Sequence, residues 1–245
     1  MDRRERQSPQ AETARVLVEF LEVAITSIVH LKGIYPPGAY ERRRYMNVVV
    51  HRARHPELKD YIHSAVNGLR SHILKGLVER VAVVFFNAEN IPLERFIFRV
   101  SVNQSYGEKV EEADLQFSLR SFLIKLPLSE PLTKPLPMGC RWEITTYFRS
   151  LPEASTSEEA DLWIPTDMKQ WMQPPLITPV KSMSSEPMSL QLYMEHPSLS
   201  EPNPQGLSIG NPFVEKYEWF SESFRVKRNE KFQIGMASLP SVLEK

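Results

Sequence analysis

Apolar residues recur at helical spacing near the start of the chain, and residues 11–31 carry the strongest pattern of the sequence. One apolar line runs through Leu17, Leu21, Ala24, Ile28 and Leu31, and a second runs through Val16, Phe20, Val23 and Val29. Only a narrow polar strip is left for water, formed by Glu19, Glu22 and Thr26. A helix that is apolar on most sides is buried, so the pattern predicts the central helix of a domain. Gly33 and the turn residues 36–38 predict where it ends.

Helical and strand patterns alternate along the following residues. Pro56 suits the first turn of a second helix, in which apolar residues recur up to Leu69. The continuous apolar run 81–86 predicts a strand buried on both faces, and the alternating residues 96–102 predict an antiparallel strand with one covered face. Residues 108–126 predict a third helix, which Pro127 and later prolines end. Shorter strands are predicted at residues 47–50, 142–148, 162–164 and 189–195.

The composition changes at both ends of the patterned region. Residues 1–10 are polar and predict a flexible N-terminus. Residues 151–161 are acidic and rich in small polar residues, which predicts a loop. Residues 196–245 combine prolines with charged and aromatic residues and show no helical or strand period, so we expect a disordered extension. An alternative is that its aromatic cluster docks on a partner or folds back on the domain; the cluster consists of Tyr217, Trp219, Phe220 and Phe224.

Composition and charge exclude some classes of protein. Hydrophobic residues make up 42% of the 245 residues, which is enough for a sizeable core. Lys and Arg number 30, and Asp and Glu also number 30, so the formal charge is zero; this counts against a protein whose main partner is a nucleic-acid backbone. Cys140 is the single cysteine, which excludes a disulfide framework and suits a reducing compartment. No secretory signal pattern follows the charged N-terminus.

Catalytic and metal-binding signatures are absent from the sequence. The nine glycines form no phosphate-binding loop, and no serine has a nucleophile-elbow pattern. His51 and His55 are four residues apart, but the Glu that a zinc protease needs after its first His is missing. We therefore expect no cofactor, no metal and no enzymatic activity, and the sequence favours a binding module.

The most basic segment combines Arg42, Arg43 and Arg44 with Arg52 and Arg54. Such charge runs are usually solvated faces. A contact with phosphates or with an acidic partner is the sharper interpretation, which leaves direct DNA binding as an alternative function of another class.

Several ordered segments point to a family. They are Tyr35-Pro36, the basic turn 42–45, residues 47–50 and 55–58, and later 81–98, 119–125 and 179–193. In this order they resemble the HORMA-domain accessory subunits of DNA polymerase zeta, relatives of the spindle-checkpoint Mad proteins. The resemblance covers residues 11–195 and implies an α+β fold, with a mixed or antiparallel sheet backed by three helices. It also implies that residues from about 150 to 195 form a mobile "safety belt" that closes over a partner peptide.

The resemblance implies a function as an adaptor. Such a protein traps a Pro-containing peptide of the polymerase zeta catalytic subunit and bridges it to a second translesion polymerase during DNA damage tolerance. It works in the nucleus, with the cytoplasm as a further location, and contacts DNA only indirectly. The alternative within the family is a mitotic checkpoint adaptor that binds cell-cycle regulators.

The same resemblance implies roles for individual residues. Tyr61 and Trp163 match residues that contact the partner peptide beneath the belt. Ile177, where the family usually has Leu, matches part of the surface for the second polymerase, together with Gln191 and Tyr193. The strand pattern independently places Gln191 and Tyr193 on one face, away from the core.

The third predicted helix carries a further expectation. Arg120 and Lys125 match residues that serve dimerisation with another HORMA protein or a second copy. Pro131 stands where the family has Ala, so the geometry of such a dimer is expected to differ here.

Overall fold

A computed structural model describes residues 8–132, 135–150, 163–166, 171, 173–197 and 223–226. Within these residues no helix has the length and apolar character needed to cross a membrane. The expected flexible N-terminus, the expected loop at 151–161 and most of the C-terminal extension lie outside the described residues.

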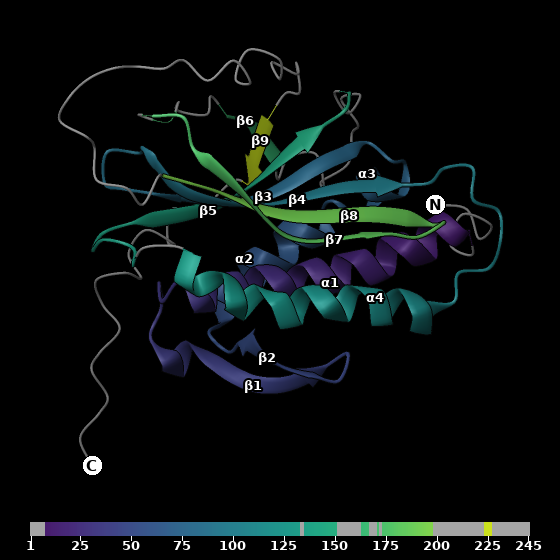
Figure 1. Ribbon diagram of the computed structural model, residues 1–245, viewed down its shortest axis with the longest axis horizontal. Coiled ribbons are helices and arrows are strands. Elements are labelled where there is room, and N and C mark those ends of the chain that lie inside the picture. Colours follow the sequence, from purple (N-terminus) through teal and green to yellow (C-terminus); the bar gives the residue numbers. More distant parts are fainter. Residues whose placement is uncertain are drawn as a thin grey trace.

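The described elements form three layers (Figure 1). A seven-stranded antiparallel sheet has the order β6-β9-β5-β3-β4-β8-β7, a layer of helices covers one of its faces, and a two-stranded hairpin lies beyond the helices. The helices are α1 (Pro9–Leu31), α2 (Pro56–Asn67), α3 (Arg70–Leu74) and α4 (Glu112–Lys125), with 3-10 turns η2 (Pro37–Ala39) and η3 (Leu126–Leu132). The strands are β1 (Tyr40–Tyr45), β2 (Val48–Ala53), β3 (Val78–Phe86), β4 (Pro92–Val102), β5 (Arg141–Phe148), β6 (Trp163–Pro165), β7 (Leu176–Ser184), β8 (Met188–His196) and β9 (Ser223–Val226).

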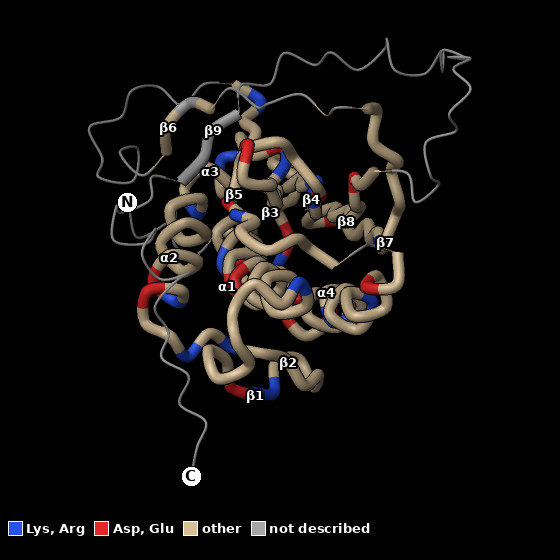
Figure 2. Tube along the Cα trace, turned by 90° about the vertical axis from the view of Figure 1, so that its left-hand side faces the viewer, with Lys and Arg blue, Asp and Glu red and all other residues tan. Residues whose placement is uncertain are grey.

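Helix α1 is the central helix that the apolar pattern predicts. It lies between α2 and α4 in the helical layer (Figure 2). Ser8 caps its start by accepting a hydrogen bond from the N–H of Ala11, and Gly33 follows its end with a φ of 63°, a conformation that suits glycine. Phe20 packs edge-on against Phe98 of β4 and Phe122 of α4, so one side chain joins the sheet to two helices.

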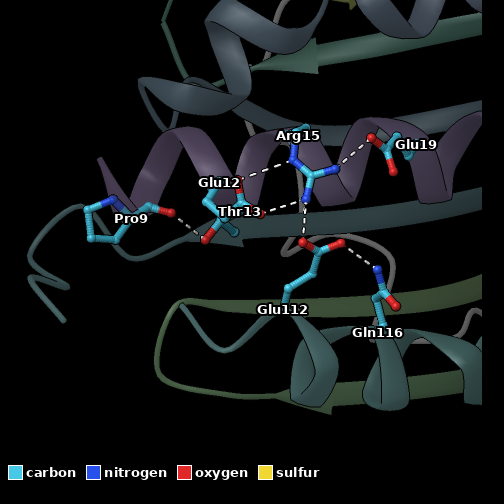
Figure 3. A network of polar contacts seen from close by, with 7 residues as sticks. All are labelled: Pro9, Glu12, Thr13, Arg15, Glu19, Glu112 and Gln116. Carbon is cyan, nitrogen blue, oxygen red and sulfur yellow. Dashed lines mark hydrogen bonds and ion pairs between the residues drawn. The ribbon is translucent and has the colours of Figure 1, made fainter. Parts of the chain in front are cut away.

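A cluster of charged groups also ties α1 to α4 (Figure 3). The guanidinium of Arg15 contacts the carboxylates of Glu12 at 2.6 Å, Glu19 at 2.8 Å and Glu112 at 2.7 Å. Gln116 donates a further hydrogen bond to Glu112. The hydrogen bond from Arg15 lowers the pKa of the Glu12 carboxyl. Because three carboxylates share one cation, the cluster orients the start of α4 relative to α1.

The hairpin of β1 and β2 corrects one prediction. Residues 42–45 are not a turn but the second half of strand β1, and the predicted strand 47–50 begins at Val48. Met46 and Asn47 both have positive φ, 46° and 59°, which is the backbone of a type I′ hairpin turn. Met-Asn lacks the glycine that usually marks this turn, so the sequence pattern missed it.

One further boundary and one burial pattern differ from the sequence prediction. Helix α4 starts at Glu112 rather than at residue 108, because Glu111 is extended with a ψ of 98°. Strand β4 is covered on both faces between residues 94 and 98, not on one. Glu94 forms a buried ion pair of 2.6 Å with Lys32, and Arg95 contacts Glu195 at 3.2 Å, so these buried charges are paired.

The second half of the domain adds a hairpin to the sheet. In β8 the alternate residues 188, 190, 192 and 194 are buried, which confirms the strand predicted at 189–195. Strand β7, which pairs with β8, was not predicted, because Pro179 and polar residues interrupt its pattern and the register shifts between Pro179 and Lys181. The α+β class is confirmed: the three longer helices α1, α2 and α4 back an antiparallel sheet.

The C-terminal extension also contributes to the sheet. Residues 223–226 form strand β9, which pairs with β5 on one side and with β6 on the other. The extension was expected to be disordered, and at residues 223–226 the structure differs from that expectation. A strand of four residues that is paired on both sides depends on the backbone bonds of its neighbours, so its own sequence need not show a longer alternation.

Candidate functional site

Strand β5 has one fully paired edge and one partly paired edge. It pairs with β3 along its whole length, from Arg141 to Phe148. On its outer edge, only Thr145, Thr146 and Tyr147 pair with β9. Strand β6 lies on the other side of β9. We call the strand-wide position between β5 and β6 the β5–β6 slot.

Tyr61 reaches the inner end of this slot from α2. Its ring packs edge-on against Trp142, with centroids 5.3 Å apart. Its hydroxyl accepts a hydrogen bond from the backbone N–H of Ile144 over 3.3 Å. The Tyr61 hydroxyl takes the place that a neighbouring strand would have at Ile144, and the pairing of β9 ends one residue away, at Thr145. Tyr61 is only 8% exposed and belongs to the hydrophobic core.

Trp163 lies on the opposite side of the slot, in β6. Its register partner is Val226 of β9, and its ring packs edge-on against Phe148 at the end of β5. The side chain is buried, and its indole N–H has no hydrogen-bond partner among the described residues. The structure thus brings Tyr61 and Trp163 to two sides of one strand position. Their contact with a peptide stays a prediction.

The hairpin of β7 and β8 carries Ile177, Gln191 and Tyr193. Ile177 pairs with Glu195, and Tyr193 and Gln191 lie two and four residues before Glu195 in the same strand, so all three side chains share the face that points away from the helices. Ile177 is 64% exposed and Gln191 is exposed. We call Ile177, Gln191 and Tyr193 the hairpin face.

Tyr193 is less exposed than the strand pattern predicts. It is half-buried and packs against a small second cluster, made of Ala82, Val84, Ile97 and Tyr147, on the sheet face opposite the helices. Burial raises the pKa of the Tyr193 phenol and raises that of Tyr147 to about 12. Tyr193 therefore has a partly structural role that sequence reasoning did not foresee.

Cations from neighbouring strands frame this face, and sequence reasoning missed them. The guanidinium of Arg80 lies 4.7 Å from the ring centre of Tyr147, and that of Arg95 lies 4.9 Å from the ring centre of Trp171. Arg95 also contacts Glu195. These residues come from β3, β4 and β8, so only the strand pairing brings them together.

Helix α4 exposes apolar side chains beside the predicted dimer residues. Phe117 is 74% exposed, Ile124 48% and Leu128, in the following 3-10 turn, 62%. Spacings of seven and four residues place these three on one side, which we call the α4 stripe. Arg120 falls within the stripe and is half-buried, whereas Lys125 is exposed at the end of the helix. The stripe was not singled out from the sequence, although its spacing is visible there.

The basic segment lies in the hairpin beyond the helices, far from the sheet (Figure 2). Arg42, Arg43 and Arg44 are exposed on β1, and Arg43 contacts Glu41 at 2.9 Å. His51, the register partner of Arg42, stacks on His30 at 3.5 Å. Within the described residues no group of three or more acidic, His or Cys side chains could hold a metal ion.

Comparison with known proteins places the chain in a family. The family model described as HORMA domain matches residues 14–157. The DNA polymerase zeta processivity subunit of Arabidopsis thaliana is 63% identical over 205 residues, which cover 82% of this chain and 95% of that protein. The human mitotic spindle assembly checkpoint protein MAD2B is 30% identical, over 74% of this chain and 90% of that protein.

Solved structures agree on the fold. A chain in the crystal structure of the mitotic checkpoint complex has a TM-score of 0.64 and 18% identity, and the alignment covers 76% of this chain and 99% of that one. HTP-2 of C. elegans, solved bound to a HIM-3 closure motif, has a TM-score of 0.61 and 8% identity, over 75% of this chain and 90% of that one. From the match of the family model and the identity to the Arabidopsis protein, the chain belongs to the HORMA domain family and is related to the processivity subunits of DNA polymerase zeta and to MAD2B.

Proposed function

We propose that this chain is a non-enzymatic adaptor of DNA polymerase zeta that captures an extended, Pro-containing peptide of the catalytic subunit in the β5–β6 slot. The observation that carries the proposal is the slot itself. The outer edge of β5 is paired at only three residues, all with the short strand β9, and Tyr61 and Trp163 lie on two sides of the slot. Addition of a strand to a sheet edge is a common way to bind an extended peptide, with backbone bonds giving affinity and side-chain pockets giving specificity.

The similarity to a processivity subunit of DNA polymerase zeta in Arabidopsis supports the choice of partner. The 63% identity spans nearly all of that protein, which supports the same fold in both chains. HTP-2, which was solved with a bound closure motif, supports peptide binding as a use of this fold. The adaptor would act in the nucleus, where polymerase zeta meets damaged DNA.

Two further surfaces complete the proposal. The hairpin face would bind a second translesion polymerase, because Ile177 offers exposed apolar area and Gln191 offers an amide beside it. The α4 stripe, with Arg120 and Lys125, would pair with another HORMA protein or a second copy. Exposed apolar residues that line one side of a helix typically mark a protein interface.

A checkpoint adaptor is the second candidate, favoured by the 30% identity to a protein named for the spindle assembly checkpoint. Both candidates use the same slot and differ in the partner that fills it. Capture of cell-cycle regulators but of no polymerase zeta peptide would favour the checkpoint role.

The experiment measures the affinity of peptides tiled across the polymerase zeta catalytic subunit for the full chain and for Trp163→Ala. Loss of an aromatic anchor should weaken binding of the captured peptide by about 2 kcal/mol or more, which is roughly a thirtyfold rise in Kd. Trp171→Ala, which removes a tryptophan near the hairpin face, is the matched control and should keep its affinity. Equal affinity of the parent and a folded Trp163→Ala would refute the proposed site.

A further inference from the structure

The β5–β6 slot is occupied by the chain itself. We propose that residues 223–226 of the C-terminal extension are an internal ligand of this slot, which an incoming partner peptide must displace. This inference rests on the proposed function, because it names how the same site is regulated. It also assigns a role to a part of the chain outside the segment that the family model matches, which ends at residue 157.

Strand pairing shows that β9 fills the whole width of the slot. Phe224 pairs with Thr146 of β5 on one side and with Pro165 of β6 on the other, and Arg225 pairs with Thr145 and Ile164. Neighbouring strands of a sheet lie about 4.8 Å apart, so a position between two paired strands holds one strand only. A peptide therefore cannot pair with residues 145–147 of β5 while β9 is in place.

The location of β9 also matches the two residues predicted for peptide capture. Its last residue, Val226, is the register partner of Trp163. Its pairing with β5 ends at Thr145, next to the Ile144 N–H that the Tyr61 hydroxyl satisfies. The extension thus occupies the backbone position that lies between Tyr61 and Trp163, which is the position proposed for the partner.

The shortness of β9 makes displacement feasible. Of the residues of β5, only 145–147 pair with β9, whereas 141–148 pair with β3. A longer peptide gains pairings along residues 141–143, beyond the Ile144 N–H that Tyr61 already satisfies, and each backbone hydrogen bond adds roughly 1 kcal/mol net. Because occupant and slot belong to one chain, the internal strand competes at every protein concentration. It would therefore select for partners long enough to exceed it.

Proline substitution tests the backbone pairing directly. A residue between two paired strands directs its N–H to one neighbour or the other, so Phe224→Pro and Arg225→Pro should each expel β9. Asn229→Pro, beyond the strand, is the matched control. Hydrogen exchange of residues 143–148 should be slow in the parent and the control and faster in both strand variants. A synthetic peptide with the sequence of residues 219–230 should restore protection.

The same variants should change the affinity for the partner peptide. If β9 fills the slot in nine of ten molecules, its removal tightens the apparent Kd about tenfold. A melting scan verifies that each variant folds. In the unmodified chain, partner peptide should speed hydrogen exchange at residues 223–226, and this result does not depend on any substitution.

The outcomes separate this inference from the proposed function. Unchanged exchange at 143–148 in folded Phe224→Pro and Arg225→Pro, with no binding of the 219–230 peptide, overturns the internal ligand. Exchange at 143–148 that speeds up on dilution of the parent also overturns it, since the strand would then come from a second copy. Binding of the 219–230 peptide without binding of any polymerase zeta peptide supports the internal ligand and refutes the proposed partner.

Discussion

The hydroxyl of Tyr61 accepts a hydrogen bond from the backbone N–H of Ile144, and this bond joins α2 to the outer edge of β5. The relationship makes Tyr61 a structural residue as well as a candidate peptide contact. Its ring is buried against Trp142, so Tyr61→Ala would open a cavity and cost about 3–5 kcal/mol of stability. A loss of peptide capture in that variant would not distinguish contact from unfolding.

Tyr61→Phe is the sharper substitution. It keeps the ring and removes only the acceptor, leaving the Ile144 N–H unsatisfied, so we expect a loss of about 1–3 kcal/mol in the free energy of unfolding. Tyr40→Phe makes the same change at a buried tyrosine in the hairpin, whose hydroxyl has no described partner, and should cost less. Urea unfolding of the two variants checks the comparison. Equal stability of both variants would show that the Tyr61–Ile144 bond contributes nothing.

The hairpin face gives a prediction about the second polymerase. Gln191→Ala and Ile177→Ala should each weaken binding of the second polymerase without changing the affinity of the β5–β6 slot for its peptide. Both side chains are exposed and lie on strands at the opposite end of the sheet from the slot. We expect at least fivefold weaker binding, or about 1 kcal/mol, in each variant. Calorimetric titration with each partner separately measures both effects.

Tyr193 needs a separate treatment on the same face. Because it packs against the second cluster, Tyr193→Ala should lower stability as well as binding of the second polymerase. Tyr193→Phe keeps the packing and isolates the hydroxyl. Ser184→Ala, at the exposed end of β7, serves as the control. If Gln191→Ala and Ser184→Ala bind the second polymerase equally well, the hairpin face is not its site.

The α4 stripe predicts the site of self-association. Phe117→Ser removes the most exposed apolar side chain of the stripe, and Arg120→Ala removes the cation within it. Each should lower the fraction of dimer in the peptide-bound chain, and Lys59→Ala, an exposed cation on α2, should not. Light scattering over a range of concentrations measures the mass. An unchanged mass in both stripe variants would remove the interface from α4.

Much of the fold could be predicted because burial leaves periodic traces in the sequence. Helix α1 and strand β8 are patterned over many residues, and both were found. Strand β7 was missed because Pro179 and a register shift break its period. The turn at Met46 and Asn47 was missed because its positive φ angles fall on residues other than glycine. In both cases the residues adopt a backbone conformation that their types do not favour, so the sequence around them does not predict it.

The candidate site could be predicted only in part, because most of its residues come together through the order of strands in the sheet. Period two alone placed Gln191 and Tyr193 on one face, but the covering of Tyr193 by Ala82, Ile97 and Tyr147 depends on the order of β3, β4, β5 and β8 in the sheet. Tyr61 and Trp163 were linked only through the family resemblance, since no spacing connects residues so far apart. The role of residues 223–226 required the pairing with β5 and β6 itself.

Stability should fall in mildly acidic solution through the stacked pair of His30 and His51. Burial lowers the pKa of both imidazoles; the other imidazole adds to the effect on His30, and Arg42 adds to that on His51. The unfolded chain then binds more protons than the folded chain below the ordinary histidine pKa of about 6.5. Stability is therefore full above this pH and decreases as the pH falls below it. Thermal unfolding of the parent and of His51→Gln at pH 7.5 and pH 5.5 measures the effect, and the variant should lose less.

The basic hairpin leads to a prediction about DNA. The basic segment has five exposed arginines, at positions 42–44, 52 and 54, and can neutralise at most about five phosphates. The slope of log K against log salt concentration should therefore not exceed about −4.5 in magnitude. Arg43 is already paired with Glu41, and the formal charge of the whole chain is zero, which weakens long-range attraction. We expect DNA binding by the isolated chain to be weak near physiological salt.

Replacement of Arg42, Arg43 and Arg44 by Gln should change the affinity for the polymerase zeta peptide by less than twofold. Fluorescence anisotropy of labelled duplex DNA over a salt series tests this, and tight binding that the triple Gln variant abolishes would establish direct DNA binding as a function of this hairpin.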